Sequence, residues 1–255
     1  MNTTVRAEIR DLLKKGLGAK LPYEQVKNGF INVPNPSECM MHVRKWAPDF
    51  EYVHTLLLRT IRRYLNEKGR VLDIGAGNGR LSKLMLEEFA ESHVTLLDVS
   101  AGLLGVASSA LSSFPDRIDT IQGDFFDTAL TFPSESFDCI VSSFAVCHGR
   151  GESVYRELYR RIYNWLGPQS CFICLDHVHG PTVDITELGL EDWESQLSGH
   201  FGEEGAGGII INTLSEDSPI SVSKHLELLT AAGFPAVDVL WKKHVFALYA
   251  GFKGE

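Results

Sequence analysis

Short apolar runs alternate with segments of helical periodicity from residue 70 onward. The segment LSKLMLEEF, for example, carries its apolar side chains at i, i+3, i+4 and i+8, on one face of a helix. Successive parallel strands need a crossover connection, which is usually a helix. The alternation therefore predicts an α/β fold in which helices cover both faces of a doubly wound, mostly parallel sheet. The predicted strands are RVLDIG, HVTLLDV, IDTIQGD, FDCIVSSFAV and CFICLDHV.

The last part of the chain departs from this alternation. A helix that begins after Ser221 and stops at Gly233 is followed by two apolar runs, AVDVLWKKH and VFALYAGFK. A tight turn near Lys242 to His244 joins them, and strands joined in this way pair antiparallel. The chain is therefore expected to end in an antiparallel hairpin.

Residues 1–69 are predicted to form an N-terminal helical cap and a lead-in helix. A short amphipathic helix is expected over residues 1–16, and the lead-in helix over residues 50–65. The polar stretch between them contains four prolines and is expected to be an irregular cap rather than a sheet element. The apolar positions of the first helix are Val5, Ile9, Leu12 and Leu13.

Residues 70–255 are predicted as the main domain, interrupted by an acidic insertion at residues 182–219. The stretch GHFGEEGAGG within it contains five glycines. Such a segment is expected to supply no core and to act as a mobile, lid-like loop. Together with the N-terminal segment it is expected to build the variable walls of a pocket, with Trp46, Trp193 and Phe201 as candidate wall residues.

The composition is that of a globular chain with an acidic surface. Of the 255 residues, 44% are hydrophobic and 22% are charged, which excludes a disordered chain. The 33 Asp and Glu residues outnumber the 24 Lys and Arg residues, so the formal net charge is −9. Because such a surface repels polyanions on average, nucleic acid is disfavoured as a partner.

The chain contains five cysteines, an odd number, and they are expected to be free thiols in a reducing compartment. No apolar run is long enough to span a membrane, and charges interrupt every candidate core of a secretory signal. The expected location is therefore cytoplasmic, without membrane attachment. The cysteines are Cys39, Cys139, Cys147, Cys171 and Cys174.

The stretch VLDIGAGNGRL, residues 71–81, joins an apolar strand to a helix through a glycine-rich turn. At this turn of a doubly wound sheet a nucleotide-like ligand binds. A dinucleotide fingerprint G-x-G-x-x-G would need glycine where Arg80 stands, which disfavours NAD. Asp73 precedes the first glycine by two residues, and its carboxylate would repel a pyrophosphate but accept an ammonium group. S-adenosyl-L-methionine (SAM) offers both an ammonium and a sulfonium.

Carboxylates also follow the second and third predicted strands. Asp98, in LLDVS, stands where a carboxylate can accept hydrogen bonds from two ribose hydroxyls. Asp98 could instead cap the next helix, a role for which Ser100 competes. Asp124, in QGDFF, lies beside Phe125, a combination suited to the amino group and ring of adenine.

With VLDIGAGNGRLS, TLLDVSAGLL, QGDFFD and FDCIVSSFAV, the chain resembles the class I SAM-dependent methyltransferases over residues 70–179 and 221–253. The resemblance implies a Rossmann-like fold with a seven-stranded sheet that the C-terminal hairpin completes. It makes residues 70–255 the SAM-binding domain, and S-adenosyl-L-homocysteine (SAH) the product. It also implies cofactor-binding residues, which are Asp73, Gly75, Ala76, Gly77, Asp98, Val99, Gly123, Asp124, Phe125, Ser143 and Phe144.

Methyl transfer from a sulfonium is an in-line displacement, so the enzyme mainly aligns the reactants and excludes water. A base is needed only where the acceptor must lose a proton. Candidates after the fourth and fifth strands are His148, Asp176 and His179, with His148 the first choice. A backbone carbonyl could equally hold a histidine at this junction. His177 and His179 lack a third ligand at a supporting spacing, so no metal is predicted.

The expected reaction is methyl transfer to an oxygen or nitrogen of a small organic acceptor. Residues 44–48 match an R-x-x-x-P segment and are faintly similar to carboxy-SAM synthases, in which Arg44 would hold the carboxylate of the cofactor. The alternatives are therefore a carboxy-SAM synthase-like or tRNA-modifying enzyme and, from another class, a non-catalytic SAM-binding regulator. The N-terminal helix could pack over the cofactor or against a second subunit in a homodimer.

Overall fold

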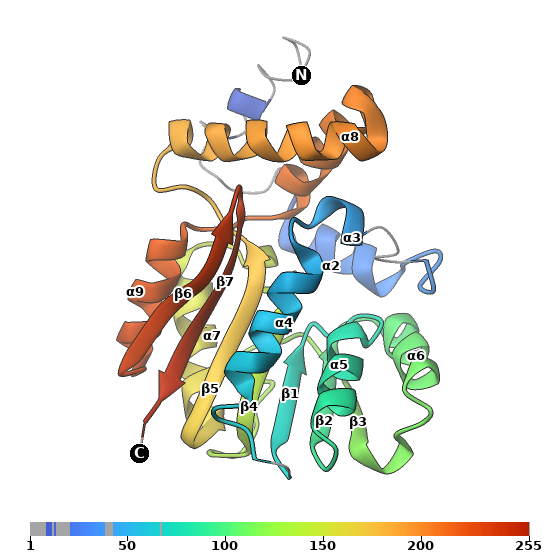
Figure 1. Ribbon diagram of the computed structural model, residues 1–255, viewed down its shortest axis with the longest axis vertical. Coiled ribbons are helices and arrows are strands. Elements are labelled where there is room, and N and C mark those ends of the chain that lie inside the picture. Colours follow the sequence, from blue (N-terminus) through green and yellow to red (C-terminus); the bar gives the residue numbers. More distant parts are fainter. Residues whose placement is uncertain (1–8, 12, 14–20, 39–42, 67, 255) are drawn as a thin grey trace.

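The computed structural model describes residues 9–11, 13, 21–38, 43–66 and 68–254. Its centre is a seven-stranded sheet in the order β3-β2-β1-β4-β5-β7-β6 (Figure 1). The first five strands in sequence pair parallel, and β7 pairs antiparallel with both β5 and β6. The strands are β1 Arg70–Ile74, β2 His93–Asp98, β3 Ile118–Gln122, β4 Phe137–Ser143, β5 Leu166–His177, β6 Ala236–Lys243 and β7 Phe246–Lys253. The predicted α/β sheet and its closing hairpin are thus confirmed.

Helices cover both faces of the sheet because its strands alternate their apolar side chains between two cores. Val71 of β1 packs with α4, α5 and α6 on one face, whereas the next residue, Leu72, packs with α7 and α9 on the other. Cys171 and Cys174 of β5 likewise enter different cores. The covering helices are α4 Phe50–Ile61, α5 Arg80–Glu88, α6 Ala101–Ala110, α7 Glu152–Trp165 and α9 Val222–Ala232.

The N-terminal region is more regular than expected. The helices α2 Tyr23–Ile31 and α3 Val43–Trp46 occupy part of the stretch predicted as an irregular cap, although none of its described residues forms a strand. The lead-in helix α4 forms as predicted but ends at Ile61. Ile9 and Leu13 are helical and buried, and most of residues 1–16, like Cys39, lies outside the described residues.

The insertion at 182–219 is a helix rather than a loop, so that prediction was wrong. Helix α8, Val183–Glu216, crosses the end of the sheet and bends at Gly202, whose φ of 73° is not helical (Figure 1). Its apolar positions supply a third core, so the expectation that this segment has none was also wrong. Packing of that apolar face outweighs the low helix propensity of the glycines. The core residues from α8 are Leu190, Trp193, Leu197, Ala206, Ile210 and Leu214.

Truncation of Leu197 tests how much this third core contributes. Leu197 is fully buried, so Leu197→Ala should lower the free energy of unfolding by about 2–5 kcal/mol. Leu188, on the same helix, is 55% exposed, and Leu188→Ala should change it by no more than about 0.5 kcal/mol. Urea denaturation measures both. Equal effects of the two substitutions would contradict the packing of α8 described here.

The four cysteines that the structure describes are free and buried, as predicted. They are Cys139, Cys147, Cys171 and Cys174. Within the described part of the chain, no helix combines the length and apolar character that a membrane crossing requires.

Candidate functional site

The glycine-rich turn after β1 adopts a backbone that only small residues accept. Gly75 and Gly77 have φ values of 69° and 54°. A Cβ atom on Gly75 would lie 2.2 Å from the Cβ of Ala145, so glycine is required there both for space and for conformation. The Gly75 amide donates to the carbonyl of Leu97, 2.8 Å away, which ties the turn to the end of β2.

Two buried carboxylates flank this turn. Oδ2 of Asp73 accepts a 2.6 Å hydrogen bond from Ser82, and burial raises the pKa of Asp73 to about 7. Asp98 accepts from the Gly77 amide through Oδ2 and from the Ser100 amide through Oδ1, both at 2.9 Å. Burial raises the pKa of Asp98, and these amides oppose the rise. The N-cap of α6 is Ser100, so Asp98 does not have the alternative role of capping this helix.

The end of β4 forms the other side of the turn. Ser143 is its last residue, and Phe144 follows with φ of 57°, a strained conformation for a bulky side chain. The Phe144 amide donates to the carbonyl of Leu175, and its ring packs 4.9 Å from that of Trp46. Backbone strain of this kind is typical of ligand sites, where surrounding contacts hold it in place.

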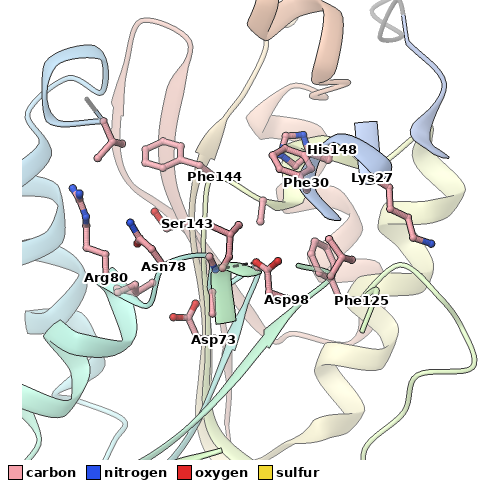
Figure 2. A pocket seen from close by; sticks show the side chains of 18 of the residues that line it. Lys27, Phe30, Asp73, Asn78, Arg80, Asp98, Phe125, Ser143, Phe144 and His148 are labelled. Carbon is pink, nitrogen blue, oxygen red and sulfur yellow. Dashed lines mark hydrogen bonds between the residues drawn. The ribbon is translucent and has the colours of Figure 1, made fainter. Parts of the chain in front are cut away.

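These elements line a cleft that is open to solvent. Figure 2 shows Asp73 and Asp98 at its base, with Phe30 and His148 on the opposite wall. Helices α2 and α4 complete the enclosure, so the N-terminal segment does form a wall, as predicted. The predicted site residues that line the cleft are Asp73, Gly75, Ala76, Gly77, Asp98, Val99, Phe125, Ser143, Phe144 and His148.

Gly123, predicted to bind the cofactor, and Asp124, predicted to recognise adenine with Phe125, do not line this cleft. The Tyr23 hydroxyl donates to Oδ1 of Asp124 at 2.8 Å, and Nζ of Lys27 lies 3.0 Å from Oδ2. Both partners come from α2, which the sequence reading had taken as irregular. The Asp124 side chain thus joins α2 to the loop after β3.

Arg44 also does not line the cleft, although its guanidinium lies 5.8 Å from the ring centre of Phe50, which does. The structure therefore does not support the predicted contact of Arg44 with the carboxylate of the cofactor. Its side chain is 66% exposed and pairs with Glu51 at 3.0 Å. Arg80 instead lines the cleft, with its guanidinium 5.3 Å from the ring centre of Phe50. Arg80 belongs to the glycine motif itself, where we used it only to disfavour NAD.

His148 is the one predicted catalytic residue that reaches the cleft. It ends a short 3-10 helix, η2 Val146–His148, and its ring packs 4.7 Å from that of Phe30. Its Nδ1 lies 2.9 Å from Oδ1 of Asp217, which leaves Nε2 as the nitrogen for a ligand in the cleft. Burial disfavours the imidazolium, but Asp217, with smaller contributions from Asp176 and Glu216, outweighs the effect of burial and raises the pKa of His148.

The segment after α8 is fastened to the loop that carries His148. The Ser218 amide donates to the carbonyl of Cys147 at 2.8 Å, and Arg150 donates to the carbonyls of His148 and Glu216, both at 2.7 Å. These bonds hold Asp217 beside His148. The insertion therefore supplies a side chain to the site, which its glycine-rich sequence did not reveal.

Asp176 and His179 lie behind the site and do not line the cleft, so the geometry does not support their predicted catalytic contacts. Asp176 accepts from the backbone amides of Cys147 and His177, both at 2.8 Å, and burial raises its pKa to about 6. His179 is 2% exposed, and burial lowers its pKa to about 3. A neutral, enclosed imidazole of this kind is a structural group.

Among the described residues, one group could place metal ligands close together. It is Cys147, His148 and Asp217, whose ligand atoms lie within 4.8 Å of one another. His177 and His179, the pair raised from sequence, are not part of it, and their ring centres are 5.8 Å apart. The absence of a metal remains a prediction.

The sequence reading missed the residues that come from outside the predicted sheet. Trp193, a predicted wall residue, instead lies in the α8 core and donates from Nε1 to the carbonyl of Trp46. Phe201 likewise packs against that core. Only tertiary packing brings the following additional residues to the cleft: Tyr23, Lys27, Phe30, Val43, Phe50 and His54.

Comparisons with known proteins show similarity to methyltransferases. A family model described as a methyltransferase domain matches residues 71–169. The chain is 26% identical over 201 residues to a malonyl-[acyl-carrier protein] O-methyltransferase of Priestia megaterium, covering 74% of this chain and 69% of that protein. It is also 26% identical over 171 residues to ribosomal RNA small subunit methyltransferase H of Nostoc punctiforme, and spans 54% of that protein's length.

Solved structures show the same fold. Human N-acetylserotonin methyltransferase in complex with SAM superimposes with a TM-score of 0.59 at 18% identity, covering 100% of this chain and 68% of that one. The buried Asp73, the glycine turn and Asp98 are the groups that an ammonium and a ribose require, so the residues present fit SAM. Residues 71–169 therefore match a methyltransferase domain, and the chain is similar in sequence and fold to class I SAM-dependent methyltransferases.

Proposed function

We propose that this methyltransferase transfers the methyl group of SAM to an oxygen or nitrogen atom of a small organic acceptor. The observation that carries the proposal is the placement of His148, which faces the cofactor cleft and is backed by the buried Asp217 carboxylate. An acceptor that carries a proton needs such a base at the point of attack. This placement supports His148 as the proposed base.

In the proposed reaction, SAM supplies an electrophilic methyl group on a sulfonium. His148 removes the proton from the acceptor O–H or N–H through Nε2, and the freed electron pair forms the bond to the methyl carbon as the bond to sulfur breaks. Asp217 stabilises the imidazolium that results, because its carboxylate lies against Nδ1. Once SAM and the acceptor fill the cleft, Phe30, Phe144 and the α2 helix would exclude water from the aligned reactants.

The walls of the cleft favour a small acceptor over a polymer. Aromatic side chains line it from α2, from the loop after β3 and from the residue after β4, and these are Phe30, Phe126 and Phe144. The acidic chain, with its net charge of −9, does not attract a polyanion. One relative is named as a ribosomal RNA methyltransferase, so RNA is tested as the competing acceptor.

A binding and transfer assay tests the proposal. Isothermal titration should show binding of SAM and SAH and none of NAD. With SAM labelled in its methyl group, label should pass to one or more small phenols, carboxylic acids or amines, and not to ribosomal or transfer RNA. Label found in RNA alone would establish the RNA-modifying alternative. Tight SAM binding with no transfer to either class would favour the regulatory alternative.

A further inference from the structure

A single carboxylate joins two imidazoles behind the cleft. Oδ1 of Asp217 lies 2.9 Å from Nδ1 of His148, and Oδ2 lies 3.0 Å from Nδ1 of His177. The two histidines come from η2 and from the last residue of β5, and Asp217 follows α8. Three elements that are distant in sequence therefore meet on one buried side chain.

His177 makes this contact from the interior. It is 2% exposed, does not line the cleft, and packs between Trp193 and Phe246 at ring distances of 6.0 and 5.5 Å. Its Nε2 has no hydrogen-bond partner among the described residues, so Asp217 is the polar group that orients the ring. The backbone amide of His177 donates to Oδ1 of Asp176, which fixes the backbone from which the ring extends.

We propose that His177 is a positioning residue for the His148 base. It donates from Nδ1 to Oδ2 of Asp217 and so keeps Oδ1 turned toward Nδ1 of His148. This inference rests on the proposed function, because it acts through the base assigned there.

The charges around the pair explain why a second donor is needed. Two other carboxyl groups, those of Asp176 and Glu216, repel an ionised Asp217. Although burial favours the neutral acid, the two histidines hold the pKa of Asp217 well below its usual range. A carboxylate with only one of its oxygens satisfied could rotate away from His148. The titratable and charged groups that act on Asp217 or His148 are Asp98, Cys147, Arg150, Tyr155, Asp176, His177, His179 and Glu216.

A matched pair of substitutions at position 177 tests the proposal. Phenylalanine keeps the ring shape and removes the donor, whereas asparagine keeps an N–H near the place of Nδ1. We expect His177→Phe to lower kcat at least tenfold, with the KM of the acceptor and the Kd of SAM within about threefold of wild type. His177→Asn should recover most of the lost kcat. Equal losses in both variants would indicate a packing role and overturn the proposal.

The pH profile gives a second readout. If His177→Phe releases Asp217, His148 loses the carboxylate that raises its pKa. The acid limb of the kcat profile should then move to lower pH in His177→Phe and stay in place in His177→Asn. An unmoved limb in His177→Phe would contradict the proposal.

His148→Ala, assayed in parallel, separates failure of this inference from failure of the proposed function. Loss of kcat in His148→Ala with full activity in His177→Phe would overturn the inference alone. Full activity in both variants would overturn the proposed base and the inference with it.

A measurement on the wild-type chain removes any dependence on folding of the variants. Nitrogen-15 NMR of the histidine rings distinguishes the two tautomers. We expect His177 to carry its proton on Nδ1, as donation to Asp217 requires. A proton on Nε2 alone would leave no donor toward Asp217 and would refute the inference.

Discussion

Replacement of His148 by alanine should lower kcat about 100- to 10,000-fold, which is the usual contribution of a general base. The Kd for SAM should stay within about threefold of wild type, because Asp73, Asp98 and the glycine turn are untouched. The residual kcat of the His148→Ala variant should also no longer fall at low pH, because the group whose protonation causes that fall is absent. In the wild type the acid limb of the kcat profile should lie above the usual histidine pKa of 6.5, since Asp217 keeps His148 protonated to higher pH and only the neutral ring accepts a proton.

Single-turnover methyl transfer with an acceptor from the screen measures this effect. His93→Ala is a suitable control, because His93 begins β2 at the far end of the strand from the glycine turn and is not among the cleft residues. Its kcat should match that of the wild type. A His148→Ala enzyme that retains its kcat would show that the acceptor reacts without a base from this position.

Replacement of Asp98 by alanine should weaken SAM binding about 5- to 150-fold, equivalent to about 1–3 kcal/mol. The side chain is buried at the base of the cleft, and it also holds the amides of Gly77 and Ser100. Its loss removes an acceptor for the ribose hydroxyls and leaves two amides without a partner. Isothermal titration with SAM and SAH measures the change, and both ligands should weaken alike because both carry the ribose.

The matched control is Asp119→Ala. Asp119 lies on the adjacent strand β3, but its side chain is 69% exposed and does not line the cleft. Its removal should leave the Kd unchanged. If Asp98→Ala folds and binds SAM as the wild type does, the ribose assignment is incorrect.

The cofactor half of the site was predictable because its signals are local in sequence. The glycines at positions 75 and 77 adopt left-handed φ values within a few residues of a strand end, and strand order brings Asp98 to the same edge. Asp124 shows the limit of that reasoning. It follows its strand as expected, but its carboxylate is engaged by Tyr23 and Lys27 of a helix that the proline-rich sequence did not indicate.

Most residues on the acceptor side of the site could not be predicted from the sequence. Arg44 was chosen for a short motif but is exposed, while Arg80 reaches the cleft from the neighbouring helix. Helix α8 was predicted as a loop because its sequence contains a stretch with five glycines. Its apolar residues, which pack in the third core, were given too little weight. The free-energy cost of forming this helix is offset only when its apolar face packs against other elements. The periodicity of one segment does not show whether such packing partners exist.

By itself, the sequence determined the alternating sheet, the C-terminal hairpin, the glycine turn with its two carboxylates, and His148 as the candidate base. All of these depend on period, turn chemistry and spacing, which act over a few residues. Only the tertiary structure decided which groups surround the base, because Asp217 and His177 reach it from other elements. Such contacts form when buried polar groups from distant segments must satisfy one another, and that requirement exists only after the segments have packed.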